Sequence, residues 1–169
     1  GMLLNGETDL AFFNLPIKSP DIDYEVIKHE EVLVVMAAGH PLAHSGCIRE
    51  GCKYPWMDLQ QLKDEPFIMQ IPGQRTRETV DHLCRKSNFS PIVKLETSNI
   101  PAAVQLAGKG YGCFFVTETH LRHITQTDPV VCFSVGEPCT TVDFVAAFRK
   151  NSYLPYHARE YITIVKNFT

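Results

Sequence analysis

The stretch Glu31-Val32-Leu33-Val34-Val35-Met36-Ala37-Ala38-Gly39-His40-Pro41-Leu42-Ala43 decides the fold. Its first part is an apolar run rich in valine, which predicts a strand buried between two other layers. The run stops at Gly39 and Pro41, because glycine frees the backbone and proline removes a donor from the ladder. The chain is therefore expected to contain a buried sheet in which this strand ends in a tight turn.

Strands and helices alternate along the rest of the chain. We expect strands at residues 9–13, 24–37, 67–69, 92–95, 113–116, 130–135 and 141–149, and helices at residues 57–62, 74–87, 99–109, 118–124 and 155–168. We also expect Leu3–Gly6 to be the last turn of a helix, and residues 44–55 to be an irregular loop. This alternation predicts a mostly parallel α/β arrangement.

Length and charge narrow the class of protein. The 169 residues can bury a core, either as one domain or as two small lobes. The net charge of −3 argues against nucleic-acid binding by this chain alone, since DNA-binding proteins show a basic footprint. No apolar run is long enough to span a membrane and no secretory signal pattern is present, so we expect a cytoplasmic protein.

The six cysteines are expected to be reduced thiols, as is usual in the cytosol. Cys84 falls on the apolar face of a helix, and Cys113 and Cys132 fall within strands, where cysteine packs as a small hydrophobic residue. Cys47 and Cys52 share a short loop and are the only pair that the sequence allows to cross-link or to share a metal. No ligand spacing accompanies them, so no metal site is expected.

Four motifs occur in a fixed order along the chain. They are Asn5-Gly6-Glu7-Thr8-Asp9-Leu10-Ala11-Phe12, Gly39-His40-Pro41-Leu42-Ala43, Trp56-Met57-Asp58-Leu59 with Leu62-Lys63-Asp64-Glu65-Pro66-Phe67-Ile68, and Val104-Gln105-Leu106-Ala107-Gly108-Lys109-Gly110-Tyr111-Gly112. Together they resemble the effector-binding domain of LysR-type transcriptional regulators, and the resemblance covers nearly the whole chain.

This resemblance implies a two-lobed α/β fold like that of type II periplasmic binding proteins. Residues 3–26 and 128–169 would form lobe I, which would be incomplete at its N-terminus, and residues 27–127 would form lobe II. A small, anionic effector would bind in the cleft between the lobes, without cofactor, metal or catalysis. Self-association is implied as well, with no membrane partner and with DNA contacted only through a helix-turn-helix domain absent from this chain.

Candidate effector-binding residues follow from the rule that ligands of open α/β sheets lie at the carboxyl ends of strands. One such end contains Asn14, a second contains Gln70 and Ile71, and a third is the segment Thr97-Ser98-Asn99-Ile100. The third opens a helix, whose free backbone N–H groups favour an anionic group. The sequence therefore suggests a small carboxylate as the effector.

Each candidate also has a purely structural explanation. Ser98 or Asn99 could cap the helix without contacting a ligand. Arg75 and Arg77 could attract an anion or point into solvent. His40, between glycine and proline in a turn, is expected to be structural.

Two other functions remain open at this point. One is a stand-alone solute-binding protein of the same fold, and the other is an enzyme on this fold, such as a dehydratase-like domain. The sequence contains no GxSxG, P-loop or HExxH motif, and no acid or base that we can assign to a cleft. A binding protein without catalytic activity is therefore the expectation.

Overall fold

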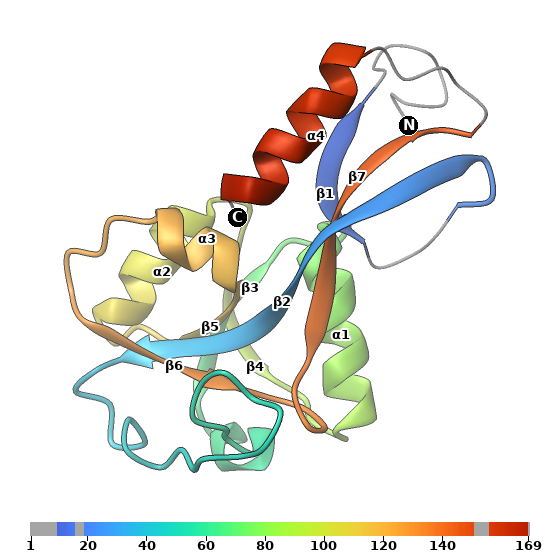
Figure 1. The fold of residues 1–169 in the computed structure, drawn as a ribbon. Coiled ribbons are helices and arrows are strands. Elements are labelled where there is room, and N and C mark those ends of the chain that lie inside the picture. Colours follow the sequence, from blue (N-terminus) through green and yellow to red (C-terminus); the bar gives the residue numbers. More distant parts are fainter. Residues whose placement is uncertain (1–9, 16–18, 151–155, 169) are drawn as a thin grey trace. The chain divides into compact units, whose positions relative to one another are not determined.

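The computed structural model describes residues 10–15, 19–150 and 156–168 (Figure 1). The chain divides into two compact units, one of residues 1–30 and 142–169 and the other of residues 31–141. We call them unit 1 and unit 2. The helical turn expected at Leu3–Gly6 lies outside the described residues.

The sheet of unit 2 contains five strands in the order β6, β2, β5, β3, β4. Their bounds are β2 Ile22–Ala37, β3 Pro66–Gln70, β4 Ile92–Thr97, β5 Cys113–Thr117 and β6 Val130–Ser134. β3 runs parallel to β4 and β5, as expected, but β2 runs antiparallel to β5 and β6. The mostly parallel sheet predicted above is therefore wrong. The loop after β2 leads to β3, which does not pair with β2, so no helical crossover joins β2 to a parallel neighbour.

Helices connect strands of unit 2 and pack against its sheet. They are α1 Arg75–Lys86, α2 Ile100–Gly108 and α3 Glu118–His123, with a short 3-10 helix η1 at Leu59–Leu62. A core cluster forms between α2 and the sheet from Val35, Ile68, Ala103, Val104, Ala107, Phe114 and Val116. Phe67 stacks on Phe115 with ring centroids 5.2 Å apart. Apolar burial of this kind holds the strand ends of unit 2 in place.

Unit 1 consists of β1 Ala11–Leu15, β7 Thr141–Arg149, the first half of β2 and the helix α4 Tyr156–Phe168. β1 and β7 are antiparallel, and Phe12 contacts both Phe144 and Tyr161. Helix α4 buries Ala158 and Ile162. Tyr161 is 53% exposed, and its ring meets that of Phe12 edge to face, with centroids 5.6 Å apart.

The boundary between the two units lies at other residues than the boundary between the lobes that the family resemblance implied. Residues 128–141, expected in lobe I, lie in unit 2. The reason is the pairing of β6 with β2, which runs from Leu33 opposite Ser134 to Ala37 opposite Val130. None of the described helices is both long and apolar enough to cross a membrane.

Candidate functional site

The carboxyl ends of β3 and β4 lie side by side in unit 2. Gln70 pairs with Thr97 across the two parallel strands, and the Ile71 backbone N–H donates to the Thr97 carbonyl at 3.3 Å. Helix α1 follows one strand end and helix α2 the other. The structure thus brings six of the seven candidate residues to one edge of the sheet, namely Gln70, Ile71, Thr97, Ser98, Asn99 and Ile100.

Asn99 is the residue that caps α2. Its Oδ1 accepts the backbone N–H of Ala102 at 3.0 Å, and its carbonyl accepts that of Ala103 at 3.0 Å. The Asn99 N–H in turn donates to Thr97 Oγ1 at 3.0 Å. Of the two capping residues that the sequence left open, Asn99 therefore takes the structural role, which typically stabilises a helix by about 1 kcal/mol.

Ser98 is left free by this arrangement. Its side chain is exposed, and no hydrogen bond is recorded for its hydroxyl or its backbone N–H within the described residues. The Ile100 backbone N–H likewise has no recorded hydrogen bond within the described residues. The residue after Ile100 is a proline, which has no N–H. One hydroxyl and two backbone donors are thus available to an anion, beside the positive end of the α2 dipole.

Gln70 ends the neighbouring strand β3, and Arg77 of helix α1 contacts it. The Gln70 side chain is 6% exposed, and its Nε2 has no hydrogen-bond partner in the described part of the chain. A cavity of about 10 Å³ adjoins it, which is enough for about one water molecule. The Arg77 guanidinium donates to the Gln70 carbonyl and to Glu96 Oε1, the latter at 2.8 Å. Arg77 therefore ties the two strand ends together.

The remaining candidate, Asn14, belongs to unit 1. It lies in β1 and pairs with Phe144 of β7. His40, by contrast, has the structural role expected of it. Its Nδ1 accepts the Leu42 N–H at 3.1 Å, so Nε2 carries the proton and donates to Glu65 Oε2 at 3.0 Å.

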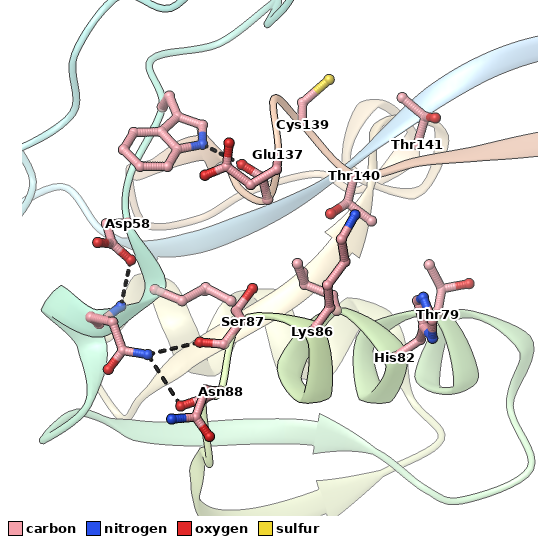
Figure 2. Close-up of a pocket in the computed structure, with 15 residues that line it drawn as sticks. Asp58, Thr79, His82, Lys86, Ser87, Asn88, Glu137, Cys139, Thr140 and Thr141 are labelled. Carbon is pink, nitrogen blue, oxygen red and sulfur yellow. Dashed lines mark hydrogen bonds between the residues drawn. The ribbon is translucent and has the colours of Figure 1, made fainter.

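A larger pocket of about 550 Å³ opens elsewhere in unit 2 (Figure 2). The second half of α1 forms one wall and the segments around residues 56–60 and 136–141 form the others. The Trp56 Nε1 donates to the Gly136 carbonyl at 2.8 Å, and the Gln60 Nε2 donates to the Ser87 carbonyl at 2.9 Å. These bonds fasten the walls to one another, which makes the pocket a defined feature of the fold.

Charges of both signs border this pocket. Lys86 comes from α1, and Glu137 and Asp58 come from the facing segments (Figure 2). Glu137 is paired with Arg49 at 2.7 Å. The sequence reasoning missed this pocket, because its walls come from three segments that are far apart along the chain and carry no motif.

A buried polar network lies at the start of α3. Glu118 is 2% exposed and accepts the Glu31 backbone N–H at 2.7 Å and the Lys53 ammonium at 2.8 Å. Burial alone would raise the pKa of Glu118, but the bonds from Lys53 and Glu31 outweigh it and lower that pKa. Within the described residues, no three His, Cys, Asp or Glu side chains gather as metal ligands.

Comparison with known proteins points to one family. The family model of the LysR substrate binding domain matches residues 1–169. The HTH-type transcriptional regulator YcgK of Bacillus subtilis, itself uncharacterised, is 24% identical over 172 residues, which is 96% of this chain and 52% of that protein. The chain thus spans about half the length of this relative.

Solved structures agree with that match. The effector-binding domain of QuiR in complex with shikimate superposes with a TM-score of 0.76 and 26% identity, covering 99% of this chain and 74% of that one. The regulatory domain of CcmR from Synechocystis PCC6803, in complex with 2-PG, gives a TM-score of 0.83 at 21% identity, covering 99% and 76%. The fold is that of type II periplasmic binding proteins.

Proposed function

The chain belongs to the LysR substrate-binding domain family, and we propose that it senses a small anionic metabolite on behalf of a transcriptional regulator. The observation that carries this proposal is the α2 N-terminus, where the Ser98 hydroxyl and the N–H groups of Ser98 and Ile100 have no recorded partner. Three available donors at a positive helix end match a carboxylate.

The neighbouring strand end would complete the site. Ile71 is 37% exposed and offers an apolar surface beside Ser98, and Gln70 offers a buried amide that lacks a partner among the described residues. Thr97 and Asn99 would position the loop through their hydrogen bonds and would not bind the ligand themselves. We keep Asn14 as a predicted contact.

The relatives support a carboxylate as the ligand class. The QuiR effector-binding domain was solved with shikimate, which carries one carboxylate on a polar ring. Its similarity covers nearly the whole of this chain. We therefore propose a small hydroxylated or apolar carboxylate and not a neutral metabolite.

Binding would act through other parts of a longer protein. The ligand would favour one conformation or one mode of self-association, and so change how attached helix-turn-helix domains sit on DNA. This role involves no catalysis by the chain and implies a cytoplasmic protein. The family match favours this regulator over the stand-alone solute-binding protein.

Thermal unfolding against a panel of ligands tests the proposal. The panel contains shikimate, other small carboxylates, amino acids and the methyl ester of each carboxylate. A ligand at one hundred times its Kd stabilises the fold by about 2.7 kcal/mol, a readable change in Tm. We expect at least one carboxylate to raise the Tm and its uncharged ester to have no effect.

Two serine variants provide the matched comparison. Ser98→Ala removes the exposed hydroxyl at the carboxyl end of β4, whereas Ser90→Ala removes an exposed hydroxyl near its other end. We expect only Ser98→Ala to weaken the response to the carboxylate. A carboxylate response that is equal in both variants would place the ligand elsewhere, and a panel without any response would contradict the sensor.

A further inference from the structure

Two cysteines that are distant in the sequence come together in unit 2. The Cys52 thiol donates to the Pro138 carbonyl at 3.2 Å, and the Cys139 thiol donates to the Gly51 carbonyl at 3.3 Å. Each sulfur therefore contacts the residue that precedes the other cysteine. Cys52 is also among the groups that raise the pKa of the Cys139 thiol, after burial and the charge of Glu31.

Contacts on both sides hold the two segments in this arrangement. The Pro55 carbonyl accepts the Ser134 N–H at 2.9 Å, and the Ser134 carbonyl accepts the Met57 N–H at 3.0 Å. Arg49 pairs with Glu137 at 2.7 Å. Cys52 lies between these contacts. Cys139 lies between Glu137 and Thr140, and Thr140 donates its N–H to the Val135 carbonyl at 2.7 Å and accepts the Val32 N–H at 2.8 Å. The backbone on either side of each thiol is therefore held in place.

The other cysteines are placed differently. Cys84 and Cys113 are buried, so a small disulfide in solvent does not reach them, and burial also raises the pKa of their thiols to about 11 and about 12. Cys132 is half-buried, and burial and the charge of Glu118 raise the pKa of its thiol. Cys47 is exposed and faces Trp56 in an isolated β-bridge. The sequence allowed only Cys47 as a partner for Cys52, whereas the structure places Cys139 beside it.

We propose that Cys52 and Cys139 are a redox modification site and form a reversible disulfide with each other. The oxidant is a low-molecular-weight disulfide. The Cys52 thiolate attacks one of its sulfurs, the S–S bond breaks, and one small thiol leaves with a proton. The Cys139 thiolate then attacks the Cys52 sulfur of the mixed disulfide and releases the second small thiol. Two protein thiols are oxidised and one small disulfide is reduced to two thiols.

The pKa of Cys139 and the exposure of both thiols indicate which thiol reacts first. Burial raises the pKa of Cys139 to about 11, and the charge of Glu31 and the Cys52 thiol add to this effect. Cys139 therefore holds little thiolate at neutral pH, which suits a residue that reacts second, in an intramolecular step. Both thiols are partly exposed, so a small disulfide can reach Cys52.

The disulfide would change a wall of the large pocket. Cys139 lies on the pocket wall between Glu137 and Thr140 (Figure 2). Joining it to Cys52 would fasten this wall covalently to the loop that carries Arg49 and Trp56. Closing a long loop also restricts the unfolded chain, so oxidation should raise the Tm by about 5–10 °C.

Oxidation with glutathione disulfide tests the proposal. The whole chain is treated at pH 8, remaining thiols are blocked with a maleimide, and intact mass gives the number of thiols lost. Digestion with trypsin and chymotrypsin separates the four relevant cysteines, because Arg49 lies between Cys47 and Cys52, and Phe133 lies between Cys132 and Cys139.

We expect the loss of two thiols and a linked pair of peptides that contain Cys52 and Cys139. Cys47→Ser, which removes an exposed thiol from the same loop, should form this pair normally. Cys52→Ser and Cys139→Ser should not form it, and Cys139→Ser should keep a glutathione adduct on Cys52. A linkage to Cys47, a disulfide between two chains, or glutathione adducts without any linkage would overturn the proposal.

Discussion

The Glu118 carboxylate accepts the backbone N–H of Glu31 at 2.7 Å. Glu31 begins the apolar run of β2 and Glu118 begins α3, so this bond joins the strand that decides the fold to a helix far along the chain. Lys53 adds its ammonium to the same carboxylate at 2.8 Å. A buried charge held in this way should make stability depend on pH.

The first prediction concerns that dependence. The pKa of Glu118 is lower in the folded state than in the unfolded chain, so its stabilising contribution is present above about pH 4.3 and is lost as the pH falls through the folded-state pKa. Glu118→Gln should lower the free energy of unfolding by about 1–2 kcal/mol at pH 7. Urea unfolding at pH 7 and at pH 4 should show the difference from the wild type shrinking at the lower pH.

Glu50→Gln is the matched control, because Glu50 is exposed in a loop and has no recorded partner in the described chain. It should change the free energy of unfolding by less than about 0.5 kcal/mol at either pH. A Glu118→Gln effect that grew as the pH fell would contradict the assigned direction of the pKa shift.

Capping and ligand binding can be separated at the α2 N-terminus. Asn99→Ala removes the acceptor of the Ala102 N–H and should lower the free energy of unfolding by about 1 kcal/mol, whereas Ser98→Ala should change it by less than about 0.5 kcal/mol. Asn99→Asp keeps a capping oxygen and should be close to the wild type. Urea unfolding without ligand measures all three, and a large loss in Ser98→Ala would mean that Ser98 is structural.

Gly136 is expected to be intolerant of a side chain. Its φ is +103°, a region that L residues rarely adopt, and an added Cβ would meet Thr140 Oγ1. Gly136→Ala should therefore lower the free energy of unfolding by about 1–3 kcal/mol. Gly39→Ala is the control, because nothing lies within 4 Å of its added Cβ. Equal Tm values for the two variants would show that the segment before Cys139 adapts freely.

Trp56 should contribute to stability through its indole N–H. Trp56→Phe removes the bond to the Gly136 carbonyl and leaves that acceptor without its partner, at a cost of about 1–3 kcal/mol. Circular dichroism must follow the unfolding, because Trp56 is the chain's one tryptophan. Tyr111→Phe, at a 55% exposed position, should have almost no effect. An unchanged free energy of unfolding in Trp56→Phe would mean that other contacts hold the pocket wall.

Periodicity in the sequence predicted the order of the strands and helices. Helix α1 buries Thr76, Val80, Leu83 and Cys84, which follow the helical spacing of three to four residues, because a helix of this length shows its period clearly. Strand direction was predicted less well. The pattern of β2 shows that it is buried, but burial on both faces occurs in antiparallel strands as well as in parallel ones.

Features that depend on distant residues could not be read from the sequence. The strand ends of β3 and β4 were predictable because a short turn and then a helix follow each of them in the sequence. Cys139 lies 87 positions after Cys52, and no local pattern connects them. The burial of Glu118 could not be predicted either, because a glutamate at a helix start is usually exposed. Only its partners on β2 and in the loop explain its burial.

The most direct test of the sensor is NMR mapping of a bound carboxylate. Amide spectra of the 15N-labelled chain would be recorded with the carboxylate that gives the largest Tm shift and with its methyl ester. The account predicts that the largest shifts with the carboxylate fall on the amides of Ser98, Asn99 and Ile100, and that the ester leaves them unchanged. Equal shifts with the ester, or largest shifts around Trp56 and Gly136, would contradict it.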